Sequence, residues 1–253
     1  MKKSQNLLFY KSKNYLLYPK ITIKELRTIS LEGGYLIDGF PTIGLTSVIA
    51  TESMIQTSQF NLAGIIDSNE FPPVSLIKNG KPNFPAGIFV NDDLRVAAFL
   101  SHIALEEQFH KSIAKKMITW AKNKKISLIV SSIPVKSNGN EKEIIATGST
   151  EKARKKIQES GIKILQHGTI PGIPGILLNE GSLVQQDVIV LLFQSDGMNP
   201  DFRSSAKLCM AMSNLIPGAT CDIVALQKEA EKIEQEIKKN VEESKEFRET
   251  MYR

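Results

Sequence analysis

The sequence has few of the residues on which metal sites and redox centres depend. Among its 253 residues are only two cysteines and three histidines. Cys209 and Cys221 form neither a CxxC nor a Cys/His pattern, so the sequence suggests neither a disulfide framework nor a zinc site. The sequence also lacks an apolar run of the roughly 20 residues that a membrane helix requires, and its first apolar run, Leu7 to Tyr10, is too short for a signal peptide. We therefore expect a protein of the reducing cytoplasm.

Motifs of the common enzyme classes are missing too. No GxSxG supplies a nucleophilic serine. The segment from Gly39 to Gly44 follows a predicted strand and opens a predicted helix, a place where main-chain N–H groups can bind an anion. A phosphate-binding loop would continue with Lys and then Ser or Thr, but Leu45 and Thr46 follow, and no GxGxxG is present. We interpret the segment as a tight turn; an enzyme for a small anionic substrate, nucleotide-like or phosphate-bearing, is the alternative.

One set of side chains has the spacing of a metal site. His102, Glu106 and His110 would share a face if one helix contained all three, and Glu107 would add a carboxylate. However, His102 is expected to end the preceding strand, and no further His or Cys completes the shell. We predict no metal, no cofactor and no catalytic residue.

The net charge of +5 has a local origin. The first 20 residues contain lysines and no acidic residue, while the remainder is nearly balanced. Such an arm can contact nucleic acid, but no aromatic residues interleave with a basic motif, so we do not expect nucleic-acid binding.

Apolar runs and helical patterns alternate along the centre of the chain, which predicts an α/β fold: a three-layer α/β/α sandwich with a mainly parallel central sheet. The predicted strands are Tyr35 to Asp38, Leu62 to Ile66, Gly87 to Val90, Leu94 to Leu100, Ile126 to Val130 and Val188 to Phe193. The predicted helices are residues 44–57, Leu105 to Asn123, Thr150 to Ser160, Gly175 to Val184 and Pro200 to Leu215. The turn signal Asn79-Gly80 predicts a hairpin between Val74 to Ile77 and Phe84 to Phe89.

After Pro217-Gly218 the composition changes. Residues 227–253 are densely charged with both signs and contain no Gly or Pro, which predicts one long helix. Its apolar residues follow a loose heptad, so the helix either enters a short coiled coil or packs along its own domain. Thirty helical residues would span roughly 45 Å. We therefore divide the chain into a basic N-terminal arm or strand (1–28), an α/β domain (29–222) and a C-terminal helix (223–253).

The last three residues, Met251-Tyr252-Arg253, resemble a recognition motif. A tyrosine ring offers a large contact area with few torsions to freeze. A carboxylate at Arg253 can pair with a lysine in a pocket of a partner. We predict partner binding at this end of the chain.

Several motifs together resemble those of the proteasome assembly chaperone family, and of its archaeal members in particular. The resemblance covers about residues 33–222. The motifs are Leu36 to Leu45, Glu70-Phe71-Pro72-Pro73, Trp120-Ala121-Lys122, Gly172-Ile173-Pro174-Gly175-Ile176-Leu177-Leu178 and Pro200 to Ala206.

The resemblance implies a fold related to nucleoside phosphorylases without their activity, and a homo-oligomer that helps to build the α-ring of the proteasome. In such proteins a terminal hydrophobic-Tyr-X motif enters pockets between neighbouring proteasome α-subunits. Met251, Tyr252 and Arg253 match that motif as anchor, aromatic plug and carboxylate donor. The lysine-rich N-terminal arm matches no motif of the family. A coiled-coil scaffold for another partner is a third possibility, in which Tyr252 would be replaceable.

Overall fold

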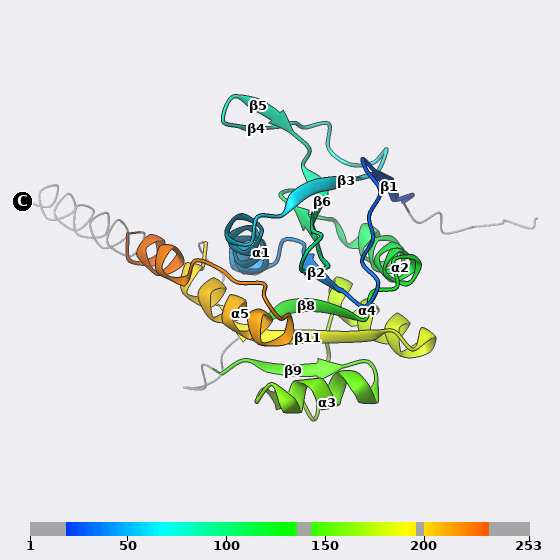
Figure 1. Ribbon diagram of the computed structural model, residues 1–253, viewed down its shortest axis with the longest axis vertical. Coiled ribbons are helices and arrows are strands. Elements are labelled where there is room, and N and C mark those ends of the chain that lie inside the picture. The colour runs from blue at the N-terminus through cyan, green and yellow to red at the C-terminus, as the bar shows by residue number, and fades with distance from the viewer. Residues whose placement is uncertain (1–18, 136–142, 196–199, 233–253) are drawn as a thin grey trace, which may run out of the picture.

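The computed structural model describes residues 19–135, 143–195 and 200–232, which form an α/β fold around a nine-stranded sheet (Figure 1). Its strands are β1 (Thr22–Glu25), β2 (Tyr35–Gly39), β3 (Asn61–Asp67), β6 (Ala86–Asn91), β7 (Val96–Ser101), β8 (Leu128–Val135), β9 (Ile145–Gly148), β10 (Lys163–Ile164) and β11 (Asp187–Gln194). A separate hairpin comprises β4 (Leu76–Lys78) and β5 (Lys81–Asn83). The helices are the 3-10 turn η1 (Ile43–Leu45), α1 (Thr46–Thr57), α2 (Glu107–Asn123), α3 (Glu151–Glu159), α4 (Gly172–Val184) and α5 (Phe202–Leu215).

All six strands and five helices predicted from the sequence are present, with ends shifted by a few residues. The strands β9 and β10 were not predicted, and β1 falls within the segment 1–28, which was predicted as an arm or a strand. These strands lie at or near the two edges of the sheet, where one or both faces are open to solvent and the apolar pattern is weak.

The sheet is mixed, so the prediction of a mainly parallel sheet was wrong. The strand order is β1-β3-β6-β7-β2-β8-β11-β9-β10. Only the central four strands, β7-β2-β8-β11, run parallel throughout. On one side of this parallel group, β1, β3 and β6 extend the sheet by antiparallel pairing. On the other side, β9 is antiparallel to β11. The connection between β6 and β7 is a tight turn at residues 92–95, and so short a link permits only antiparallel pairing.

Helices cover both faces of the sheet and create two buried clusters. On one face, α2 and α4 pack on the sheet through Phe109, Ile113, Met117 and Leu177 among others. On the other face, α1, α3 and α5 contribute residues such as Met54, Ile157, Leu208 and Met212. Central strands supply side chains to both clusters in alternation, which explains why their sequences are largely apolar.

Trp120, in one of the family-like motifs, connects α2 to the edge of the sheet. Its ring packs edge-on against Phe99 with centroids 5.1 Å apart. Its Nε1 donates a hydrogen bond to Glu25 Oε1 (2.9 Å), while Lys124 Nζ contacts Glu25 Oε2 (2.8 Å). A single tryptophan therefore fills the core and holds β1 in place.

The predicted hairpin turn at Asn79-Gly80 is confirmed, but its strands are shorter than predicted. Residues from Ala86 onward belong to β6 of the main sheet. The hairpin stands away from the body of the molecule (Figure 1) and contacts α1 through Lys78 Nζ and Glu52 Oε1, 3.3 Å apart. Within the described residues, no helix has the length and apolar character needed to cross a membrane.

Gly175 provides a test of how closely α4 approaches the preceding loop. A Cβ atom at this position would lie 1.9 Å from the carbonyl oxygen of Ile170. We expect Gly175→Ala to lower the free energy of unfolding by about 2 to 3 kcal/mol, because a backbone atom cannot move aside as a flexible side chain can. Urea denaturation measures the change.

The matched control is Gly168→Ala. There the nearest atom is the end of the Leu165 side chain, at 3.2 Å, and the residue is exposed. This variant should change stability by less than about 0.5 kcal/mol. Equal effects of the two substitutions would contradict the packing argument.

Candidate functional site

The predicted partner-binding residues Met251, Tyr252 and Arg253 lie outside the described residues, as does most of the predicted C-terminal helix. The structure does place the beginning of that helix, residues 223–232. Figure 1 shows it leaving the body of the molecule beyond α5. Asp222 caps it, because its Oδ1 accepts a hydrogen bond from the Ala225 N–H (2.8 Å). We call residues 216–232 the arm base.

Hydrogen bonds join the arm base to the C-terminal end of α1. The Thr220 N–H donates to Ser58 Oγ (3.0 Å), and Ser58 Oγ lies 3.2 Å from the Thr220 carbonyl oxygen. The Asp222 N–H donates to Thr57 Oγ1 (3.0 Å). Three hydrogen bonds from two neighbouring side chains thus define where the C-terminal helix starts.

Apolar packing adds to these bonds. Ala219 is completely buried, and Leu226 and Ala230 are 6% exposed. Leu226 and Ala230 are one turn apart and share a helix face, whereas Val224 points away and is 60% exposed. The first apolar residues of the predicted heptad therefore pack on the protein's own domain. This packing is one of the two arrangements that the sequence predicted.

A disulfide bond also holds the arm base, which corrects the expectation drawn from the cysteine spacing. Cys209 on α5 and Cys221 are bonded, with their Cα atoms 6.3 Å apart. The cysteines are 12 residues apart. This spacing has no motif signature, because the turn after α5 that brings them together is a feature of tertiary structure.

The turn after β2, considered as an anion site, is closely packed. A Cβ atom on Gly39 would lie 2.8 Å from Thr51 Cγ2 and 2.9 Å from the Phe99 carbonyl oxygen, so the helix after the turn fills the space beside it. The Gly44 carbonyl oxygen accepts a hydrogen bond from the Asp201 N–H (2.9 Å) at the start of α5. The turn thus connects two helices of one layer, which favours the structural interpretation of this segment.

Asp38 is a buried carboxyl group that the sequence analysis treated only as a strand residue. It accepts hydrogen bonds from Ser131 Oγ (2.6 Å) on β8 and from the Phe40 N–H (3.2 Å). Burial raises its pKa to about 6, although both hydrogen bonds oppose the shift. Its position after two apolar residues of a predicted central strand was a usable signal.

A chain of hydroxyl groups lies on the other face of the sheet, which α1 covers. Thr42 Oγ1 is 3.0 Å from Ser47 Oγ, which is 2.8 Å from Ser132 Oγ. These contacts join the turn after β2, the first turn of α1 and strand β8. Their hydrogen-bonding capacity is used within the protein, so the cluster stabilises the turn.

The suspected metal ligands do not converge. His102 follows β7 directly, as expected, and its Nε2 lies 3.9 Å from Glu52 Oε1. Glu106 is the N-cap residue of α2, and His110 Nε2 lies 3.2 Å from the Leu105 carbonyl oxygen. Within residues 19–135, 143–195 and 200–232, no group of three or more His, Cys, Asp or Glu side chains is placed to hold a metal ion.

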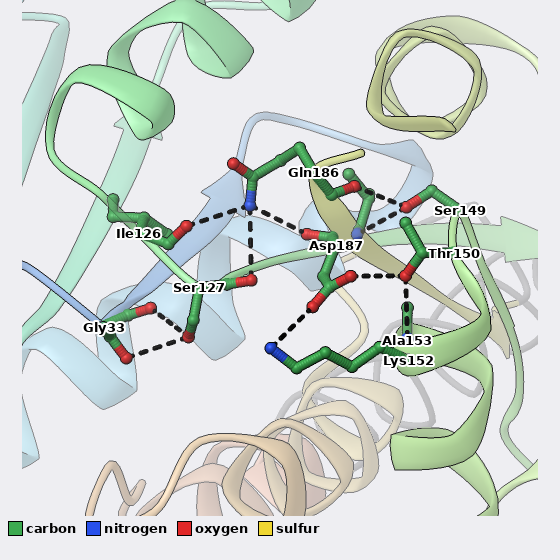
Figure 2. A network of polar contacts seen from close by, with 11 residues as sticks. Gly33, Ile126, Ser127, Ser149, Thr150, Lys152, Ala153, Gln186 and Asp187 are labelled. Atoms are coloured by element: carbon green, nitrogen blue, oxygen red, sulfur yellow. Dashed lines mark hydrogen bonds and ion pairs between the residues drawn. The ribbon is translucent and has the colours of Figure 1, made fainter. Parts of the chain in front are cut away.

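A second polar network lies at the opposite, amino ends of the parallel strands (Figure 2). Thr150 Oγ1 donates to Asp187 Oδ1 and also caps α3, while Lys152 Nζ is 3.4 Å from Asp187 Oδ2. Gln186 Nε2 donates to the Ile126 carbonyl oxygen (3.1 Å). Each contact joins two structural elements at one corner of the sheet, so we assign this network to the fold.

The raised pKa of Asp38 predicts a pH dependence of stability. Because the folded-state pKa of about 6 exceeds the ordinary aspartate pKa of 3.8, the folded chain binds the proton more tightly than the unfolded chain. Stability contributed by this group is therefore greatest at low pH and is lost as the pH rises through the two values. Asp38→Asn, which removes the charge, should stabilise the protein by about 2 kcal/mol more at pH 8 than at pH 4.

Urea denaturation at the two pH values measures this difference. Asp93→Asn, at an exposed turn position, is the matched control and should show no comparable change between pH 4 and pH 8. If Asp38→Asn behaves like Asp93→Asn, the carboxyl group of Asp38 is not held in the environment described.

Comparisons with known proteins agree with the fold and with the arm base as a part of it. The structure is similar to that of Pyrococcus furiosus PbaA, described as an archaeal homologue of proteasome-assembly chaperone: TM-score 0.82, 27% identity, 93% of this chain and 97% of that one. Pyrococcus furiosus PbaB, described as an archaeal proteasome activator, has the same fold, with TM-score 0.72, 20% identity and coverage of 87% and 98%. An uncharacterised protein of Methanocaldococcus jannaschii is 26% identical over 219 residues, 87% of this chain and 90% of the relative.

The model of the PAC2 family matches residues 36–241 of this chain. This range contains all the motifs on which the resemblance to proteasome assembly chaperones was based, and it confirms that resemblance. Because the match extends over most of the sequence, the chain belongs to the PAC2 family.

Proposed function

We propose that this protein binds proteasome α-subunits through Met251, Tyr252 and Arg253, and that it assists α-ring assembly or engages the core particle. Met251 would act as the apolar anchor and Tyr252 as an aromatic plug. The carboxylate at Arg253 would pair with a cationic group in the pocket of the partner.

The likeness to PbaA carries the proposal. It extends over nearly the whole of both chains, in sequence as well as in fold. PbaA is described as an archaeal homologue of proteasome-assembly chaperone, and PbaB as an archaeal proteasome activator. At 20% identity, the likeness to PbaB supports the fold alone. The proposal therefore includes both assembly of the α-ring and engagement of the core particle.

The arm base gives the proposal a physical mechanism. Hydrogen bonds to Thr57 and Ser58, the cap at Asp222 and the buried face of the helix fix the point from which the C-terminal helix departs. A fixed departure point reduces the freedom that residues farther along the chain must lose when they bind, and so favours affinity.

We further propose that several copies of the chain act together as a homo-oligomer. One short terminal motif is a weak ligand by itself. Motifs displayed by one oligomer would bind at a high effective concentration once the first has docked. Such an assembly could hold several α-subunits at ring-like spacing.

The proposal is for a binding function without catalysis. Two carboxyl groups at the ends of the central strands are engaged within the fold: Asp38 bonds to Ser131, and Asp187 bonds to Thr150. Hydrogen-bonding capacity used in this way stabilises the strands and turns that carry these residues.

The tail is tested by comparing three variants with the unaltered chain for binding to purified α-subunits at one salt concentration. Removal of Met251-Tyr252-Arg253 should abolish binding, and Tyr252→Ala should weaken it at least about tenfold, because a buried aromatic anchor usually dominates such contacts. Tyr252→Phe keeps the ring and should stay within about threefold of the unaltered chain.

Lys228→Ala is the control for charge on the same helix, since Lys228 is exposed and belongs to the arm base. It should bind like the unaltered protein. Full affinity in the chain that lacks the last three residues would refute the proposed role of the tail.

A further inference from the structure

The disulfide joins α5 to the arm base, the segment from which the C-terminal helix starts. Cys209 lies on α5 and is completely buried. Cys221 is half-buried and immediately precedes Asp222, the cap of the C-terminal helix. The bond therefore cross-links the α1/α5 layer to the residue that precedes the cap of the C-terminal helix.

The surroundings of Cys221 suit the reduced state as well. Its Sγ lies 3.4 Å from the Ala50 carbonyl oxygen on α1, which is a ready acceptor for a thiol proton. After reduction, the hydrogen bonds to Thr57 and Ser58 and the buried side chains of Ala219, Leu226 and Ala230 would still hold the segment in place. Both redox states are thus compatible with the fold, and they differ in how firmly the arm base is held.

We propose that Cys209 and Cys221 form a redox-modification site that reversibly tightens the arm base. The unequal exposure of the two residues sets the order of steps. The thiolate of half-buried Cys221 attacks a small disulfide, RSSR, which forms a mixed disulfide and releases one thiolate, RS⁻. The Cys209 thiolate then attacks Cys221 Sγ and releases the second RS⁻. Two protein thiols are oxidised, one small disulfide is reduced to two thiols, and reduction by excess thiol reverses both steps.

The bond closes a short loop of the chain that contains the last turns of α5 and the turn at Gly218. Such a cross-link stabilises mainly by restricting the open states of the segment that it closes. Local opening of the arm base should therefore be suppressed in the oxidised protein. The effect of this suppressed opening on binding to proteasome α-subunits rests on the proposed function. The redox site formed by Cys209 and Cys221 does not.

The first measurement uses the full chain treated with glutathione disulfide or with dithiothreitol, denatured and alkylated with iodoacetamide. Because the sequence has two cysteines, the oxidised monomer should carry no alkyl group and the reduced monomer two. Two alkyl groups after oxidation, or a disulfide-linked dimer on a non-reducing gel, would overturn the proposal.

The second measurement is amide hydrogen exchange of residues 219–232 in both states, without any partner. Reduction should speed exchange at least about tenfold in this segment and leave β8 and β11 unchanged. The variant with Cys209→Ala and Cys221→Ser should exchange at the reduced rate with either reagent. Equal exchange in the two states of the unaltered protein would refute the proposal even if the variant fails to fold.

These readouts separate the two proposals. If exchange responds to reduction but removal of residues 251–253 leaves partner binding intact, the redox site stands and the tail proposal falls. If exchange does not respond but the truncated chain loses binding, the reverse holds. Where both stand, reduced protein should bind α-subunits more weakly than oxidised protein.

Discussion

The two-sided burial of the parallel strands β7, β2, β8 and β11 is the constraint on which the rest of the structure depends. Parallel strands cannot be joined by tight turns, so the chain crosses over between them, with α1 on one face of the sheet and α2 and α4 on the other. The helix α5 follows β11 and lies on the same face as α1. Because α1 and α5 must lie side by side to cover their face, the chain beyond α5 meets the end of α1. The packing of α5 beside α1 therefore determines where the arm base lies.

This arrangement separates the parts that build the fold from the part proposed to bind. Asp38 and the network around Gln186 and Asp187 lie at opposite ends of the central strands, and their hydrogen bonds connect strands to turns and helices. Chemistry in α/β folds often occurs at the carboxyl ends of such strands. At that edge, the hydroxyl groups of Thr42, Ser47 and Ser132 join the turn after β2 and strand β8 to α1.

The sequence predicted the central elements well because their signals are local. Strands such as β11 (Asp187–Gln194) are continuous apolar runs, and the helices have periodic apolar faces. The strands β9 and β10 were missed because half-exposed strands have little apolar contrast. The mixed direction of the sheet depends on connection lengths, which the alternation of strands and helices does not reveal.

By itself, the sequence determined the α/β class, the family and the candidate motif Met251-Tyr252-Arg253, because these follow from patterns that neighbouring residues carry. Tertiary structure alone decided which groups bond to Asp38, that His102 and His110 are apart, and that Cys209 meets Cys221. Each of these facts depends on which faces of distant segments come together. That pairing is set by the packing of whole helices and strands, and no local spacing encodes it.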